Sequence, residues 1–540
     1  MGFALKKPDD AVGSATPAII IGLFVAFGGV LFGYDTGTIS GILAMKKWRE
    51  MFSTGYVNPT DGLPDVTSSQ SSMIVSLLSA GTFFGALGAA PIADYFGRRI
   101  AMILDTFVFC FGVILQTAST SIPLFVAGRF FAGLGVGLLS ATIPLYQSET
   151  APKWIRGTIV GAYQLAITIG LLLAAIVNNS TKDRPDTGCY RIPVAIQFAW
   201  AIILVAGMII LPETPRFLIK KDRYEDATKA LARLRRVDIN DPIIVEELSE
   251  IQANHEFELR LGKASYLEIL RGSIGRRLAT GCGIQALQQL AGVNFIFYYG
   301  TTFFQNSGIQ NSFVITLITN IINVVSTFPG LYMVEKWGRR PLLMFGAVGM
   351  CVSQLIVAIV GTAASSTVAN KVLIAFVCVY IFFFASSWGP VAWVVTGELF
   401  PLKARAKCLS ITTATNWLLN WAIAYATPYM VNSGPGNANL QSKVFFIWGG
   451  FCFICAIFVY TCIYETKGLS LEQVDELYAK VPRAWNSVGW KPSVHYTDVR
   501  DVAGGVKGGN NLAQLETEAN EKRSGEHATH MESITGKMEA

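Results

Sequence analysis

Twelve long apolar runs limit what this chain can fold into. Each run carries few or no charges and approaches the roughly 20 residues that a helix needs to cross a bilayer. A helix satisfies its own backbone hydrogen bonds inside a membrane, where no water is available to do so. We therefore predict an all-α integral membrane protein with twelve transmembrane helices, at about 18–43, 71–93, 100–120, 123–147, 157–179, 192–212, 277–306, 312–334, 341–363, 371–396, 406–431 and 443–464.

The number and placement of charged residues agree with this fold class. Charged residues make up 15% of the 540 residues, whereas soluble globular proteins carry about a quarter. Short loops rich in Lys and Arg remain on the cytoplasmic side of a membrane. Four such loops, after the second, fourth, eighth and tenth runs, fall on one side. We therefore expect both termini to be cytoplasmic.

The runs form two halves that repeat weakly. DYFGRR (94–99) in the first half matches EKWGRR (335–340) in the second, as an internal duplication predicts. A charged stretch with helical periodicity lies between the halves. The expected domains are a cytoplasmic N-terminus at 1–17, a six-helix half at 18–212, a cytoplasmic helical linker at 213–275, a second six-helix half at 276–464 and a mostly disordered cytoplasmic tail at 465–540.

The run at 277–306 carries four amides, Gln285, Gln288, Gln289 and Asn294. An amide without partners in an apolar medium costs a few kcal/mol. On a helix Gln285 and Gln289 share one face with Gln288 beside them, so the amides form a polar stripe. Such a stripe suits a polyhydroxylated ligand, because each amide both donates and accepts hydrogen bonds. The alternative is that the amides join neighbouring helices, as polar residues do in membrane bundles.

Nine motifs follow one another in a fixed order: FGYDTGTISG (32–41), DYFGRR (94–99), GRFFAGLGVG (128–137), YQSETAPKWIRG (146–157), PETPRFL (212–218), QQLAGVN (288–294), EKWGRR (335–340), GELFPLKARA (397–406) and YETKGLS (464–470). Together they resemble the sugar porter family of the major facilitator superfamily, and most of all the fungal hexose transporters. The likeness runs from about residue 18 to residue 475. It implies the major facilitator fold, in which two six-helix halves enclose a substrate site near the middle of the membrane.

The resemblance also assigns residues that contact the sugar. Amides bond sugar hydroxyls in both directions, and an indole covers the apolar face of a pyranose. In the family the outer parts of the seventh and tenth spans close over the sugar, so Tyr298 and Tyr299 are expected to form an outer gate; aromatic packing is the alternative. The expected contacts, including the neighbouring amides Gln285 and Asn416, are Gln164, Gln285, Gln288, Gln289, Asn294, Asn323, Trp393, Asn416 and Asn420.

Asp35 and Arg129 lie within the first and fourth runs. A lone charge at such depth costs several kcal/mol, so we expect the two side chains to pair. Protonation of Asp35 would release Arg129, and the resemblance implies that this pair couples proton movement to sugar movement in proton-coupled members of the family. The alternative is a static ion pair, since facilitative fungal hexose carriers often keep the aspartate.

Opposite charges recur on the cytoplasmic side of both halves. In the family they form a network that closes the inner mouth in one state and opens in the other. We expect the same of this chain, although surface ion pairs are individually weak. The expected latch consists of Asp94, Arg98, Arg99, Glu149, Arg156, Glu213, Glu335, Arg339, Arg340, Glu398, Arg405 and Glu465.

The expected function is alternating-access uptake of glucose and related hexoses across the plasma membrane, by sugar:proton symport. The alternatives are a facilitative hexose uniporter and a transporter-like glucose receptor. We expect no enzyme activity, cofactor or metal site, and no nucleic-acid partner. The expected partners are the hexose, a proton and the lipid bilayer, with the monomer as the working unit. Asn178 and Asn179 lie in overlapping sequons for N-glycosylation on the outer side.

Overall fold

The computed structural model describes residues 16–58, 62–151, 156–241, 244–245, 247–249, 251–252, 256, 266–306, 311–363, 366–401, 404–432, 436–469 and 471–490. The chain divides into two compact units, Met1–Val488 and Gly489–Ala540. Only Gly489 and Trp490 of the second unit are described, so the expected disorder of the tail lies mostly outside the described residues.

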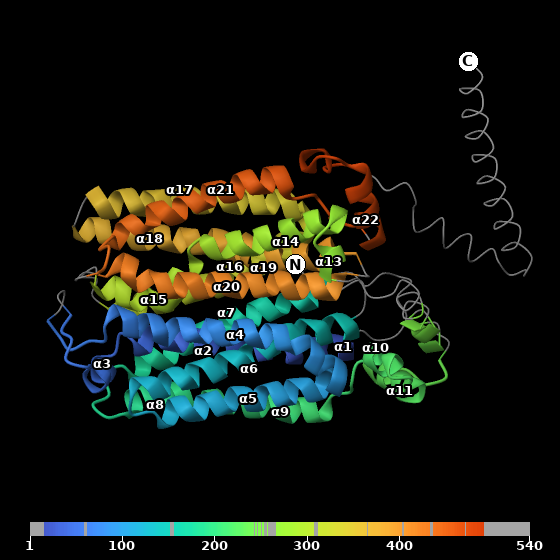
Figure 1. Ribbon diagram of the computed structural model, residues 1–540, viewed down its shortest axis with the longest axis horizontal. Coiled ribbons are helices and arrows are strands. Elements are labelled where there is room, and N and C mark those ends of the chain that lie inside the picture. The colour runs from blue at the N-terminus through green and yellow to red at the C-terminus, as the bar shows by residue number, and fades with distance from the viewer. Residues whose placement is uncertain are drawn as a thin grey trace, which may run out of the picture. The chain divides into compact units, whose positions relative to one another are not determined.

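Helices make up the first half of the large unit (Figure 1). The second of its long helices, α4, begins at a capping box: the Thr67 hydroxyl accepts from the Gln70 N–H at 3.2 Å, and the Gln70 side chain accepts from the Thr67 N–H at 2.9 Å. The elements are α1 (Thr16–Ala26), α2 (Gly28–Ile42), α3 (Lys46–Phe52), α4 (Ser68–Phe96), α5 (Arg98–Ala118), α6 (Ile122–Thr150), α7 (Arg156–Thr181), α8 (Gly188–Ala195) and α9 (Gln197–Ile210).

Two interruptions distinguish the second half. The seventh expected span is two helices that meet at Ala291 and Gly292, and Gly292 has a φ of +87°. In the tenth, a π-helical turn, η2 (Phe384–Trp388), precedes Gly389, so the irregular turn begins before the expected Gly389-Pro390 bend. The other elements are α14 (Gly272–Leu290), α15 (Val293–Asn306), α16 (Ser312–Trp337), α17 (Arg339–Ala363), α18 (Thr367–Phe383), α19 (Gly389–Leu399), α20 (Arg405–Val431), η3 (Gln441–Lys443) and α21 (Val444–Cys462).

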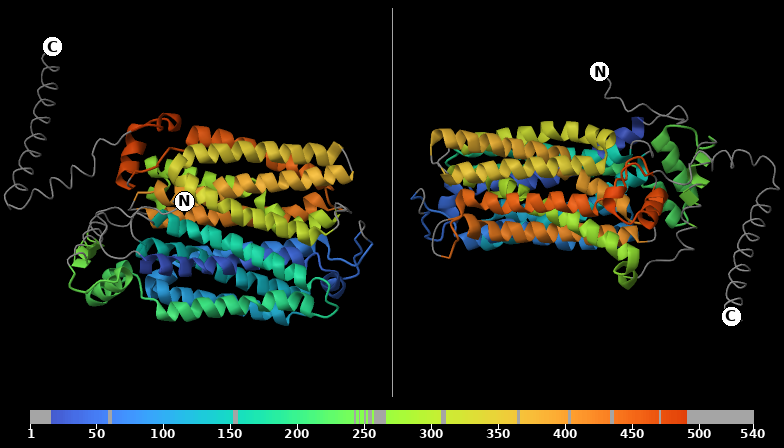
Figure 2. Two further views of the ribbon diagram at one scale, coloured as in Figure 1. Left: turned by 180° about the vertical axis from the view of Figure 1, so that it is seen from behind. Right: turned by 90° about the horizontal axis from the view of Figure 1, so that it is seen from above.

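Short helices lie outside the spans. The linker region contains α10 (Pro215–Lys220), α11 (Tyr224–Arg235) and α13 (Tyr266–Ile269), and α22 (Leu471–Lys480) and η4 (Ala484–Asn486) follow the last span. These elements lie at one end of the bundle and α3 at the other (Figures 1 and 2). We call them the linker end and the α3 end.

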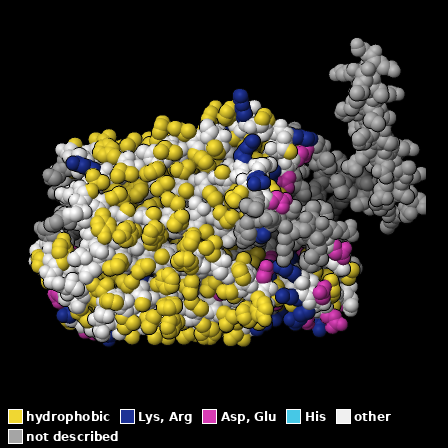
Figure 3. All heavy atoms as spheres, viewed as in Figure 1, with side chains coloured by type: hydrophobic (Ala, Val, Ile, Leu, Met, Phe, Trp, Pro, Cys, Tyr) yellow, Lys and Arg dark blue, Asp and Glu magenta, His cyan; other side chains and the backbone are white. Residues whose placement is uncertain are grey.

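Ten helical stretches of the described residues are long and apolar enough to cross a membrane. The two other expected spans are also helical, as α14–α15 and α20. These two carry the amides of the expected site, and amide side chains lower the hydropathy of a helix. Hydrophobic side chains cover the flank of the bundle, and many Lys, Arg, Asp and Glu side chains gather at the linker end (Figure 3).

Close packing joins the helices within each half and the halves to each other. Glycines bring α4 and α6 together: a Cβ added at Gly81 would lie 2.2 Å from the Phe130 oxygen, and one at Gly137 would lie 2.2 Å from the Thr82 oxygen. Between the halves, α4 packs on α20, α2 on α15 and α7 on α16. The space where a substrate site is expected is therefore bounded by α2, α4 and α7 on one side and α15, α16 and α20 on the other.

Candidate functional site

The centre of the second half holds a hydrogen-bonded network of buried amides from α14 and α20. Nδ2 of Asn416 donates to Oε1 of Gln285 at 2.7 Å and to Oε1 of Gln288 at 2.9 Å. Oδ1 of Asn416 accepts from Nε2 of Gln289 at 3.1 Å. The stripe that the sequence predicts on α14 thus faces a single asparagine on α20, which uses both of its polar atoms to bind it.

The network extends to α15 and to the first half. Nδ2 of Asn294, at the start of α15, donates to Oε1 of Gln289, which also accepts from Asn420 at 3.3 Å. Oδ1 of Asn420 accepts from the hydroxyl of Ser79 on α4 at 2.7 Å and from the hydroxyl of Tyr298 at 3.0 Å. Ser79 is the link between halves that sequence analysis did not find.

The irregular part of the tenth span anchors the network. Nε2 of Gln288 donates to the backbone oxygens of Trp388 and Gly389, at 2.9 and 3.0 Å. Pro390 has no N–H and cannot complete the helical ladder here. The Trp388 indole is buried and donates to the Leu343 oxygen at 2.9 Å, so it packs away from the amides.

Three further expected contacts lie on the helices around this network. Gln164 is half-buried on α7, and its Nε2 would lie 3.8 Å from a Cβ added at Gly389. Asn323 is buried on α16 and Trp393 is half-buried on α19. The small Gly389 thus allows Gln164 of the first half to approach the turn that anchors Gln288. The amides bond one another, which fits the polar-bundle alternative as well as a binding site.

Hydrogen bonds between the halves lie toward the α3 end. The Ser72 hydroxyl donates to the Tyr425 oxygen at 2.7 Å, and the hydroxyls of Ser40 and Thr301 lie 3.1 Å apart. Tyr299, expected as a gate residue, is buried and donates to the Ala424 oxygen at 2.8 Å. Tyr298 and Tyr299 therefore bond α20 rather than solely pack as aromatic rings.

Asp35 and Arg129 form the expected ion pair. Nη1 of Arg129 lies 3.1 Å from each carboxylate oxygen of Asp35, and both side chains are at most 1% exposed. Nε of Arg129 donates to the Ile74 oxygen on α4 at 3.2 Å. Buried Gln197, at the start of α9, interacts with the Asp35 carboxyl group. Sequence analysis missed Gln197, which an amide at the start of an apolar helix could have signalled.

In the first half, the charges at the linker end form a compact cluster. Arg98 binds Glu149 through Nη2 at 2.9 Å and Asp94 through Nη1 at 3.3 Å. Glu213 accepts from the backbone N–H groups of Arg98 and Arg99, at 3.1 and 3.0 Å. Burial raises the pKa of Glu213, and the hydrogen bonds that its carboxylate accepts act in the opposite direction.

The second half repeats this cluster residue for residue. Arg339 binds Glu398 at 2.7 Å and Glu335 at 3.5 Å. Glu465 accepts from the backbone N–H groups of Arg339 and Arg340, both at 3.0 Å. Each cluster bonds residues of its own half, so these contacts hold helix ends together within a half in this structure.

Two expected latch residues are placed differently. Arg405 donates to the Phe400 oxygen, from Nε at 3.3 Å and from Nη2 at 3.2 Å, and so helps to begin α20. The side chain of Arg156 lies outside the described residues.

The sequon at Asn178 is not accessible for glycosylation. Asn178 is 2% exposed on α7, and its Nδ2 donates to the Thr38 oxygen at 3.1 Å. Asn179 is half-buried, and its Oδ1 accepts from Lys182 at 3.1 Å. Because an oligosaccharyl group attaches at the amide nitrogen, the buried Asn178 serves as a helix contact instead.

Curated relatives align along almost the whole chain. The chain is 63% identical to the major facilitator-type transporter ecdD of Aspergillus rugulosus, over 94% of each chain. It is 54% identical to the probable glucose transporter rco-3 of Neurospora crassa, over 92% of this chain and 85% of that protein. It is 44% identical to the high glucose sensor RGT2 of Saccharomyces cerevisiae, over 88% of this chain and 62% of that protein.

Solved structures agree with the fold. The proton:xylose symporter XylE of E. coli, bound to 6-bromo-6-deoxy-D-glucose, matches with a TM-score of 0.70 and 26% identity, over 86% of this chain and 100% of that one. The sequence profile described as Sugar (and other) transporter matches residues 21–478. The chain therefore belongs to the sugar porter family of the major facilitator superfamily.

Proposed function

We propose that this sugar porter takes up glucose and related hexoses by alternating access across the plasma membrane, with both termini in the cytoplasm. The observation that carries the proposal is the buried amide network centred on Asn416, which faces Gln164 across the two halves. A hexose presents hydroxyls that donate and accept, so it can replace amide–amide bonds without leaving buried amides unpaired. The similarity to a probable glucose transporter and to a structure with a bound glucose analogue supports a hexose substrate.

We propose further that one proton accompanies each sugar. Helix α4 bonds both parts of the machinery: its Ile74 oxygen accepts from Arg129, and its Ser79 hydroxyl donates to Asn420. Protonation of Asp35 removes the charge that holds Arg129, and Arg129 is then free to change its contact with α4. A shift of α4 reaches the sugar site through Ser79, so proton and sugar each bias the same helix.

The two sets of contacts at the ends of the bundle fit an alternating cycle. The bonds of Ser72 to Tyr425 and of Ser40 to Thr301 join the halves near the α3 end. The clusters around Arg98 and Arg339 hold the helix ends of each half together at the linker end. In the proposed cycle, the first set breaks when the site opens outward, and the clusters exchange partners between halves when the inner mouth closes.

The test is uptake of labelled glucose by cells without hexose carriers of their own, at pH 5 and pH 8, with and without a protonophore. We expect wild-type uptake to be accumulative and to collapse with the protonophore, and Asp35→Asn to exchange sugar without accumulating it. Asp186→Asn is the matched control, because Asp186 pairs with Arg184 at 3.0 Å in an exposed position. Uptake that only equilibrates, regardless of pH and protonophore, would identify a facilitator with a structural Asp35–Arg129 pair.

The second candidate function is glucose sensing, which the similarity to the high glucose sensor favours. The chain spans 62% of the length of that sensor. A sensor would reach the cell surface, transport no sugar and change a transcriptional readout when glucose is added. Measurable transport by the same expressed protein rejects this candidate.

A further inference from the structure

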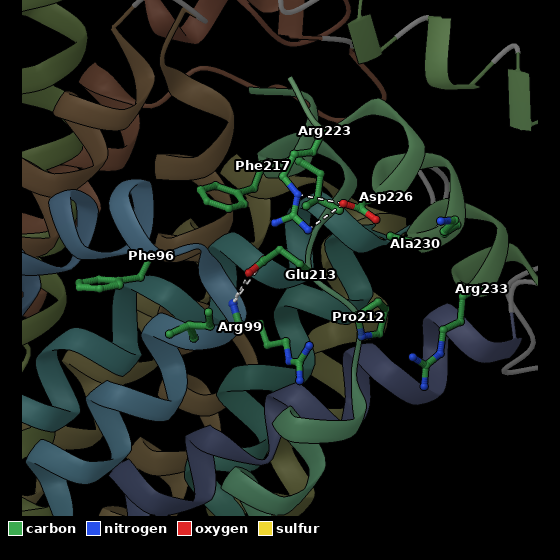
Figure 4. A pocket seen from close by; sticks show the side chains of 12 residues that line it. Phe96, Arg99, Pro212, Glu213, Phe217, Arg223, Asp226, Ala230 and Arg233 are labelled. Carbon is green, nitrogen blue, oxygen red and sulfur yellow. Dashed lines mark hydrogen bonds and ion pairs between the residues drawn. The ribbon is translucent and has the colours of Figure 1, made fainter. Parts of the chain in front are cut away.

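A cavity of about 330 Å³ lies at the linker end of the first half, outside the central site (Figure 4). Its walls come from the end of α4, the start of α5, the junction of α9 and α10, and one face of α11. Volumes of this size accommodate small ligands. The contacts of the Asp35–Arg129 pair and the amide network do not involve this cavity.

The lining carries more cations than anions. Arg99, Arg223, Lys229 and Arg233 line it, against the carboxylates of Glu213 and Asp226. Arg223 and Asp226 neutralise each other at 2.7 Å. Glu213 is engaged with backbone N–H groups, as described above. Arg99, Lys229 and Arg233 therefore leave the cavity with a positive surplus.

The two arginines are held in place by backbone oxygens. Arg99 donates to the oxygens of Met208 and Ile209 at 2.9 and 2.6 Å, and Arg233 donates to the oxygen of Ile210 at 2.9 Å. These oxygens belong to the last turn of α9, where the helix dipole favours cations. A guanidinium has five N–H donors, so both arginines keep donors for an anion while they cap α9.

An apolar wall adjoins these cations. Phe96 and Ile100 line the cavity itself and are 45% and 48% exposed. On α9, Ile209 and Ile210 are 58% and 66% exposed. These side chains belong to the ends of spans, whose exposed faces meet lipid tails. A ligand with an anionic head and apolar chains matches both surfaces at once.

The internal repeat provides a comparison within the molecule. Arg340 occupies the position in the second half that Arg99 occupies in the first. Its guanidinium donates to the oxygens of Ala484 and Tyr460 at 2.6 and 2.8 Å, and Trp485 stacks on Tyr460 with ring centroids 5.7 Å apart. The chain's own η4 segment thus covers Arg340. Among the described residues of the first half, no such segment covers Arg99.

We propose that the cavity binds the phosphate of an anionic glycerophospholipid from the leaflet at the linker end. The phosphate contacts Arg99, Lys229 and Arg233, and the acyl chains lie along Phe96, Ile100 and the end of α9. The lipid takes the place that η4 holds in the second half. It fixes α11 of the linker against α5 and α9 of the membrane bundle.

The test uses the full-length purified protein in nanodiscs of phosphatidylcholine with and without phosphatidylserine. Retained lipid is counted by mass spectrometry, and thermal unfolding is followed in parallel. Lys229→Gln/Arg233→Gln removes two cavity cations. Arg216→Gln/Arg236→Gln removes two exposed cations that do not line the cavity, which controls for net charge.

We expect the wild type and the control to retain phosphatidylserine selectively and to unfold at a higher temperature with it. The cavity variant should bind phosphatidylserine about thirtyfold more weakly, because each cation near an anionic lipid surface contributes about a factor of five. Equal retention by the cavity variant overturns the proposal. If inorganic phosphate or glycerol 3-phosphate at millimolar concentration reproduces the stabilisation in phosphatidylcholine alone, the cavity binds free phosphate, which also overturns it.

Discussion

Nη1 of Arg129 lies 3.1 Å from both carboxylate oxygens of Asp35, in a part of the bundle where neither side chain is more than 1% exposed. Such a pair is costly to break from one side, because the remaining charge is buried without a partner. Removing both charges leaves no such charge. The pair therefore makes the energetic effect of each substitution depend on the other.

The first prediction is that Arg129→Gln destabilises the protein by about 3–5 kcal/mol. The double variant Asp35→Asn/Arg129→Gln should recover a large part of this loss. Unfolding of the purified protein in detergent measures the four corners of the cycle. Additive effects of the two substitutions would mean that the pair does not interact energetically.

The second prediction concerns Asn416, which bonds three glutamines on α14. Asn416→Leu leaves these amides without their shared partner, and each lost bond costs about 1–3 kcal/mol. We expect the KM for glucose uptake to rise at least about tenfold. Thr427→Val is the control on the same helix, since Thr427 bonds only the Ile423 oxygen of α20 at 2.7 Å.

The control should change KM by less than about twofold, because it removes a bond that every helical Thr can make to its own backbone. If Asn416→Leu reaches the cell surface with unchanged KM, the amides join helices and do not bind sugar. That result would support the polar-bundle alternative for the whole stripe.

Sequence patterns predict the fold well because membrane spans are long and their composition is distinctive. Twelve apolar runs and a repeated GRR motif lead to the helices of both halves, and the pairing of charges within each cluster follows from the repeat. The pairing of Asp35 with Arg129 is also predictable, since buried charges need partners.

Contacts between distant helices are less predictable. The bond from Ser79 to Asn420 joins residues more than three hundred positions apart, and a Ser in an apolar helix gives no sign of it. The π turn at Phe384–Trp388 has no simple sequence signal, and Pro390 led to a bend expected slightly later. Asn178 matches a sequon, but the packing of α7 on α2 buries it.

The third prediction compares equivalent carboxylates of the repeat. Glu149→Gln removes the partner of Arg98, and Glu398→Gln removes the partner of Arg339. Both should lower the maximal rate of uptake at equal surface expression. The effect should be larger at Glu149, because its side chain is 8% exposed while that of Glu398 is 26% exposed, and buried partners are worth more.

Asp94→Asn is the control for this comparison, since the Asp94 side chain is 50% exposed. A surface pair contributes about 0–1 kcal/mol, so its loss should change the rate by little. Rates that fall equally for Asp94→Asn and Glu149→Gln would show that burial does not set the strength of the cluster.

The fourth prediction concerns the glycines that begin the two clusters. Gly97 has φ +92° and ψ 161°, and Gly338 has φ +98° and ψ 174°, a region that only glycine adopts readily. A Cβ at Gly97 would lie 2.4 Å from Oε2 of Glu213, and one at Gly338 would lie 2.6 Å from Oε2 of Glu465. Alanine at either position therefore combines backbone strain with loss of the carboxylate that caps α5 or α17.

We expect Gly97→Ala and Gly338→Ala each to lower the free energy of unfolding by at least about 1–3 kcal/mol, the usual cost of such strain. Gly450→Ala is the matched control: it lies in α21 with no atom within 4 Å of an added Cβ, and alanine is the better helix former. Thermal unfolding in detergent distinguishes them, since the control should unfold at or above the wild-type temperature. If Gly97→Ala unfolds with the control, Glu213 can move away from the loop without cost, and the cluster around Arg98 is not the rigid helix cap that its hydrogen bonds indicate.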